Sequence, residues 1–227
     1  MSLLLTFTLA ALIAREPAEL FGLPERRRRV AKYADCVVKI LPDTTTRIAL
    51  QTGSEMRREH DFQNVKIAHC LPGTNWMLMA DRAILQFAFA DALVRSKRLT
   101  LPADLSILKP LNQGPSGPAI ARSVMAKGKR ATEAETAAAV RAPALAELSR
   151  LGECVVRASP GGAKTLLQSE VASPDEDAAF AALSRSLGSC IDRGKTVSLS
   201  KDLVRGAIAF NYLRFSMAAS APQGVAK

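Results

Sequence analysis

A five-residue pattern of acid, cysteine, valine, valine and base occurs twice in this chain, at residues 35–39 and 153–157. A proline and then a second cysteine follow each copy. The chain's four cysteines therefore form two pairs with similar spacing: Cys36 with Cys70, and Cys154 with Cys190. We expect each pair to be a disulfide that closes one copy of a duplicated helical module. Free or reactive thiols are the alternative.

Apolar residues recur at helical spacing around both patterns. One stripe precedes Pro42 and consists of Val30, Tyr33, Val37 and Ile40. The other precedes Pro160 and consists of Leu145, Leu148, Leu151 and Val155, in a helix expected to begin at Pro143. Residues 173–176 (Ser-Pro-Asp-Glu) form a capping box that predicts another helix start. Short extended runs are expected at 76–79 and 196–199. The predicted fold is mainly α, with two tandem repeated helical modules and at most a short strand in each.

The predicted organisation has five parts: a signal peptide at 1–14, module one at 24–97, a Pro/Gly-rich connector with a short helix at 98–142, module two at 143–216, and a flexible tail at 217–227. The apolar run 3–14 is too short to span a bilayer, which takes about 20 residues, but it suits a signal-peptide core. Basic residues follow this run instead of preceding it, so an N-terminal helix is the alternative.

The chain carries a formal net charge of +10. Two basic clusters are candidate contacts for anionic partners: Arg26, Arg27, Arg28 and Arg29 at the start of module one, and Lys127, Lys129 and Arg130 in the connector. Four consecutive arginines wind around more than one helical turn, so they cannot all face one partner. The alternative for them is a solvated helix end.

The residues indicate no catalytic, cofactor or metal site. None of the cysteines has the close spacing of a zinc site or of a thiol–disulfide exchange motif, and an acid that disfavours a thiolate precedes Cys36 and Cys154. The segment 161–165 lacks the glycines of a phosphate-binding loop and is interpreted as a turn. We therefore expect no cofactor and favour a non-enzymatic protein.

The cysteine pattern, together with Cys154, Cys190 and the Arg-Gly-Ala-Ile-Ala run at 205–209, resembles a family of uncharacterised exported bacterial proteins with a duplicated two-cysteine helical module. Module one departs from that pattern at Gln86 and Phe87. The resemblance implies architecture and export but no activity.

The functional hypothesis is a binding or structural protein of the bacterial periplasm or envelope, or a secreted one. Its partners would be anionic envelope components or another protein. A basic cytoplasmic protein associated with nucleic acid is the first alternative. An enzyme of unrecognised type, with its substrate between the modules, is the second. The sequence does not predict an oligomeric state.

Overall fold

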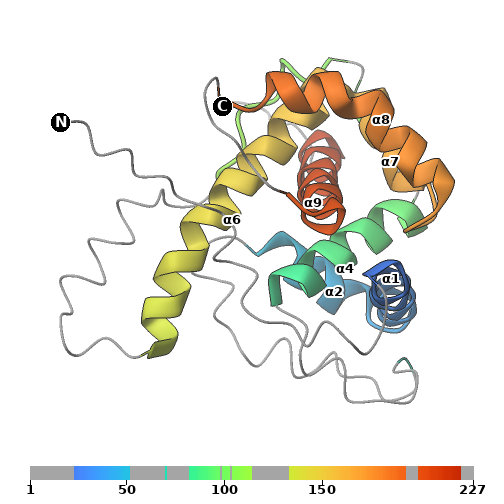
Figure 1. The fold of residues 1–227 in the computed structure, drawn as a ribbon, viewed down its shortest axis with the longest axis vertical. Coiled ribbons are helices and arrows are strands. Elements are labelled where there is room, and N and C mark those ends of the chain that lie inside the picture. The colour runs from blue at the N-terminus through green and yellow to red at the C-terminus, as the bar shows by residue number, and fades with distance from the viewer. Residues whose placement is uncertain are drawn as a thin grey trace, which may run out of the picture.

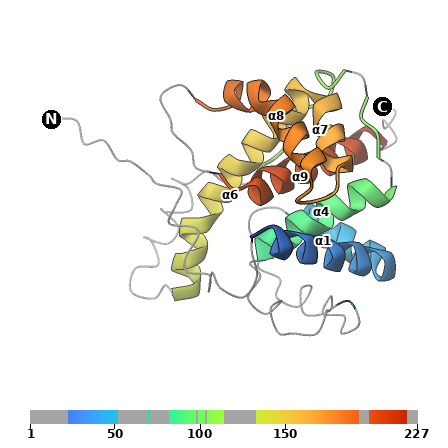
Figure 2. The ribbon, with the colours of Figure 1, turned by 45° about the vertical axis from the view of Figure 1, so that its right-hand side comes forward.

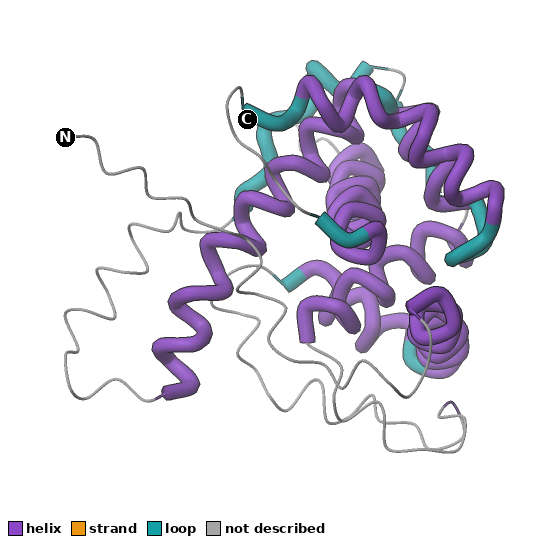
Figure 3. Tube along the Cα trace, viewed as in Figure 1, coloured by secondary structure: helices purple, strands orange, loops and turns teal. Residues whose placement is uncertain are grey.

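The computed structural model describes residues 23–51, 70, 82–97, 99–102, 104–113, 133–192 and 199–220. These residues contain seven helices and no strand, which confirms a mainly helical fold (Figures 1 and 3). The helices are α1 (Leu23–Ile40), α2 (Pro42–Leu50), α4 (Arg82–Lys97), α6 (Glu133–Ala158), α7 (Pro160–Gln168), α8 (Pro174–Ser189) and α9 (Lys201–Ser220). The extended runs expected at 76–79 and 196–198 lie outside the described residues.

Local chemistry sets several of these helix ends. A proline occupies the first turn of α2, α7 and α8, where its missing N–H removes no hydrogen bond. At the start of α8 the hydroxyl of Ser173 accepts the backbone N–H of Glu176 at 3.2 Å, as the capping box predicts. The glycines at 161 and 162, interpreted above as a turn, instead lie in the first turn of α7. That interpretation was wrong, since the preceding proline favours a helix start there.

The helix start expected at Pro143 is also wrong, because α6 runs without interruption from Glu133 to Ala158. The alanine-rich segment before Pro143 has high helix propensity, and so has the segment after it. One missing hydrogen bond at the proline therefore does not end the helix. The N-terminal part of α6 extends away from the other helices (Figure 1).

The two halves of the chain share one hydrophobic core. Helices α4 and α9 pack against each other at its centre, with α1 and α2 on α4 and with α6 and α7 on α9 (Figures 1 and 2). The core's largest enclosed side chains come from both halves and include Tyr33, Phe89, Tyr212 and Phe215. The sequence left open how the modules pack together. In the structure they pack through a direct contact between helices. The module boundaries themselves stay a prediction.

Helices of the two halves lie at corresponding positions in the chain. Each position of α7 (160–168) lies 118 residues after one of α2 (42–50), and α9 begins 119 residues after α4 begins. We call positions related in this way equivalent. The duplication of a module remains a prediction, but equivalent positions can be compared directly.

Both disulfides have the expected pairing. Cys36 bonds to Cys70 and Cys154 to Cys190, with Cα–Cα distances of 5.7 and 5.8 Å. The bridges close loops of 34 and 36 residues, each worth roughly 3–4 kcal/mol in the chain-entropy account. In the second half the bridge ties α6 to the C-terminal end of α8.

Within the described part of the chain, no helix is both long and apolar enough to cross a bilayer.

Candidate functional site

A cluster of charged side chains lies where α1, α4, α8 and α9 meet. We call it the central charge network, and its members are Arg27, Asp91, Glu176, Asp202 and Arg205. All of them except Asp202 are at most 8% exposed. Charges are rarely buried to this degree unless they are paired, so the partners of each group decide what the network can do.

Arg205 joins three elements through its guanidinium group. Its Nε and Nη2 atoms donate to the carboxylate of Asp91 at 3.1 and 3.2 Å, and Nη1 donates to Glu176 at 2.9 Å. Nη2 also donates to the carbonyls of Leu167 and Ser169 at 3.1 and 3.0 Å. Arg205 therefore neutralises two buried acids and satisfies the carbonyls at the C-terminal end of α7.

Glu176 is the fully buried centre of the network. Its carboxylate accepts from Arg27 at 2.8 Å, from Arg205 at 2.9 Å and from the backbone N–H of Ala172 at 3.0 Å. The sequence identified Glu176 only as a capping residue. Its second role had no local signal, because both arginines come from distant parts of the chain.

Arg27 connects α1 to this centre and also pairs with Asp202. Burial by itself lowers the pKa of Arg27, but its bonds to Glu176 and Asp202 outweigh this effect and raise that pKa. For Asp202, burial raises the pKa above its usual range although Arg27 lies beside it. The solvated helix end considered for the four arginines is therefore wrong for Arg27, which is buried.

The neighbouring arginines on α1 also have partners within the protein. Arg28 and Arg29 both pair with Glu25, at 3.3 and 3.1 Å, and Arg26 lies 4.0 Å from Asp202. Each of the four arginines thus has an acidic partner, but among the described residues they share three carboxylates and keep a net positive charge. The second candidate contact, formed by Lys127, Lys129 and Arg130, lies outside the described residues.

A cavity of about 60 Å³ adjoins the network. Its lining combines apolar side chains such as Val30 and Phe87 with Asp91, Asp202 and Arg205. Its acids and arginines bond to one another, so they hold the helices together and offer little for a ligand to bind.

A second polar arrangement surrounds the repeated pattern at 153–157. The guanidinium group of Arg157 donates to the carbonyls of Leu105, Leu108 and Lys109, at 2.6, 3.1 and 3.0 Å. It also lies 4.5 Å from the centre of the Phe215 ring. The base of the pattern therefore binds three backbone carbonyls of one irregular segment.

The acid of the pattern binds the same segment. Glu153 accepts the backbone N–H of Leu111 at 3.1 Å and the side-chain amide of Gln113 at 2.5 Å. Arg214 on α9 donates to the carbonyl of Asn112 at 2.6 Å. We call Glu153 and Arg157 the second clamp, and the segment 104–113 that it holds the strap.

The sequence identified the repeated pattern as the site of a disulfide, gave its acid only the effect of disfavouring a thiolate, and gave its base no role. Their recurrence around both Cys36 and Cys154 was the available signal. A spacing of four residues places an acid and a base on the same helix face, where both can reach one segment that crosses the helix. The cysteine between them instead bonds to the second cysteine of its own pair.

The described residues contain no group of histidine, cysteine or acidic side chains that could hold a metal ion. Comparison with protein families, with curated proteins and with solved structures found no match to this chain. The resemblance to exported bacterial proteins therefore stays a prediction.

Proposed function

We propose that this chain is a non-enzymatic binding or structural protein of the bacterial periplasm or cell envelope. The two disulfides carry the proposal, since such bonds persist in oxidising compartments and are rare in the cytosol. All four cysteines are paired, and each bridge lies within one half of the chain.

The bonds that the buried charged side chains make support a structural or binding role. Glu176, Arg205 and Arg27 each make several bonds to one another or to neighbouring groups. A general acid or base needs access to a substrate proton, and a nucleophile needs an open approach. In the central charge network, arginines already bond to the acids. Neither a substrate proton nor a substrate atom open to attack therefore has free access to them.

Mass spectrometry of the protein isolated from its source cells tests the proposal, with thiols blocked by acid and alkylation at lysis. We expect a mature N-terminus near residue 15 and two disulfides with the pairing given above. An intact Met1 with four alkylated thiols would overturn the proposal and favour the cytoplasmic alternative.

Cell fractionation provides an independent measurement of the compartment. The protein should be released with the periplasmic or extracellular fraction, while a cytosolic marker enzyme stays behind. Release together with that marker would count against export.

A further inference from the structure

The first half of the chain contains the counterpart of the second clamp. Asp35 and Lys39, which flank Cys36, are equivalent to Glu153 and Arg157. An aspartate replaces the glutamate and a lysine replaces the arginine, so the acid and the base keep their signs of charge. We call Asp35 and Lys39 the first clamp.

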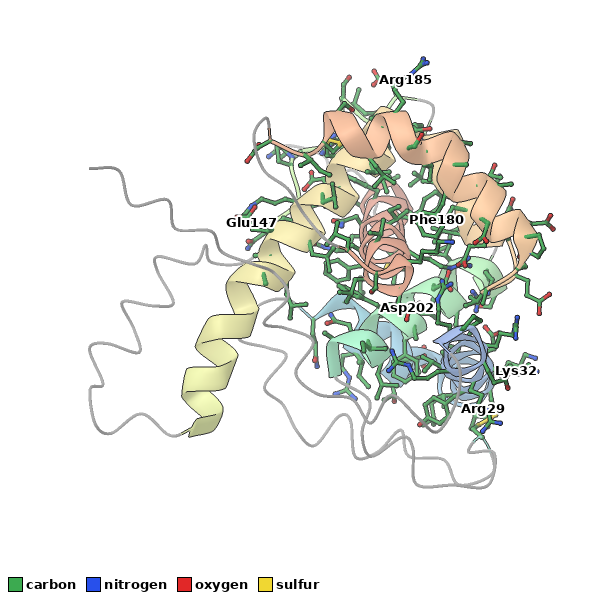
Figure 4. The ribbon with its side chains drawn as sticks, viewed as in Figure 1. Arg29, Lys32, Glu147, Phe180, Arg185 and Asp202 are labelled. Atoms are coloured by element: carbon green, nitrogen blue, oxygen red, sulfur yellow. A yellow bond between two sulfur atoms is a disulfide. The ribbon has the colours of Figure 1, made fainter. Side chains whose placement is uncertain are left out.

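The described residues leave the surface around the first clamp uncovered. A hollow on α1 is lined by Lys32, Asp35, Cys36, Lys39 and Ile40. Lys32 and Lys39 are exposed, and among the described residues Ile40 is one of three large apolar side chains with more than 40% exposure. Figure 4 shows Lys32 pointing away from the other helices. Among the described residues, no segment crosses the first clamp as the strap crosses the second.

We propose that the first clamp binds an extended peptide segment of a partner protein. Lys39 donates to backbone carbonyls of that segment, as Arg157 does to those of the strap. Asp35 accepts a backbone N–H, as Glu153 does from Leu111. Ile40 provides apolar contact for a leucine-like side chain. This inference rests on the proposed role as a binding protein and names the class of its partner.

The combination of a donor and an acceptor in the first clamp favours a peptide over a phosphate. Asp35 lies between Lys32 and Lys39 on the helix surface, and its carboxylate can only accept a hydrogen bond, which a phosphate anion does not donate. A peptide backbone offers both a donor and an acceptor and so satisfies both members of the clamp. Arg95 donates to Asp35 Oδ1 at 2.7 Å, which holds the carboxylate in place.

Two differences predict weaker binding at the first clamp than at the second. A lysine presents one compact ammonium group, whereas Arg157 bonds to three carbonyls with its planar guanidinium group. Ser96 is the equivalent of Phe215, so no aromatic ring lies at that position. Weak binding is typical of a transient partner.

The probe is a fluorescein-labelled peptide with the sequence of the strap, Asp-Leu-Ser-Ile-Leu-Lys-Pro-Leu-Asn-Gln, titrated with the oxidised full chain and followed by fluorescence anisotropy. We expect saturable binding that Lys39→Ala weakens by about tenfold, the usual effect of losing a charged hydrogen bond. Asp35→Asn should weaken it by a smaller factor, since the amide oxygen still accepts. Arg185→Ala removes an exposed charge at the far end of α8 and should leave binding unchanged (Figure 4).

Hydrogen exchange locates the bound peptide. We expect it to slow amide exchange within residues 32–40. Protection confined to α6 and α9 would mean that the peptide displaces the strap, and it would overturn the inference. Three other results would do the same: no binding at about 1 mM protein, equal binding of a scrambled peptide, or wild-type affinity in Lys39→Ala.

The proposed function can fail while this inference holds, and this inference can fail while the proposed function holds. The titration uses purified protein with intact disulfides, so a failure there says nothing of the compartment. A cytosolic location with reduced thiols overturns the proposed function but leaves the peptide measurement as it was.

Discussion

The two halves of the molecule place different residues at one equivalent position and use them for the same backbone task. In the first half Gln86 donates to the carbonyl of Gln51, at 2.6 Å, beyond the end of α2. In the second half Arg205 donates to the carbonyls of Leu167 and Ser169 at the end of α7. Only the arginine reaches further, to the acids of the central charge network. A neutral side chain is enough to cap the helix, whereas the ion pairs with Asp91 and Glu176 take a charge.

The next position along the same helices shows a second difference. Phe87 and Gly206 are equivalent, and they touch where α4 crosses α9. A Cβ atom added to Gly206 would lie 2.4 Å from the Cβ of Phe87, far inside van der Waals contact. One half thus provides the bulk and the other provides the space for it. Identical residues at this crossing would either clash or leave a gap.

The largest expected effect comes from Arg205→Gln, which gives the second half the residue of the first. The change leaves Asp91 and Glu176 buried with one fewer cation each. Breaking a buried pair in this way costs about 3–5 kcal/mol. Urea denaturation measures the free energy of unfolding. Arg185→Gln, on the exposed face of α8, is the control and should change stability by less than about 0.5 kcal/mol. A loss below about 1 kcal/mol for Arg205→Gln would show that the network does not join the halves.

The disulfides should stabilise the two halves equally. Their loops differ by only two residues in length. Replacing either cysteine pair by serine is therefore expected to cost roughly 3–4 kcal/mol in the chain-entropy account. The same denaturation experiment compares the two variants. If one pair cost more than twice the other, strain or packing, and not loop closure, would dominate.

Gly206→Ala tests the crossing of α4 and α9. We expect it to cost about 2–3 kcal/mol, because the clashing Phe87 atom is a Cβ that cannot swing away. Gly188→Ala is the matched control, since nothing lies within 4 Å of its added Cβ. That variant should be neutral or slightly stabilising, as alanine is the better helix former. Equal effects of the two substitutions would contradict the close approach.

The smallest effect is a pH dependence at Asp202. Because its pKa is raised in the folded protein, the folded state holds this proton more tightly than the unfolded state does. Its contribution to stability therefore increases as pH falls towards 4 and decreases as pH rises through the folded pKa. Asp202→Asn cannot titrate at this position. The stability of wild type relative to this variant should shift in favour of wild type between pH 7 and pH 4. Parallel curves, or the opposite shift, would contradict the raised pKa.

The sequence determined those features whose causes are local. The capping box predicted the start of α8, and the prolines at 42 and 160 predicted where α1 and α6 end. The apolar stripes predicted the buried Tyr33, Val37, Leu148 and Val155, although Ile40 at the end of α1 is exposed. The disulfide pairing followed from matching cysteine spacings. Where local signals conflicted, as at Pro143 within an alanine-rich stretch, the expected boundary was wrong.

Only the tertiary structure decided which charges are buried and what they bind. Arg27 stands in a row of four arginines, and no neighbour in sequence marks it as the one that enters the core. Its partner Glu176 lies 149 residues away, and the strap lies some 50 residues before the clamp that holds it. Such contacts arise when helices pack, because a buried charge then has to find its counter-charge among the groups brought near it. The repeated acid and base are evident in the sequence. Only the structure shows what they bind, because the strap lies across one copy of the pattern.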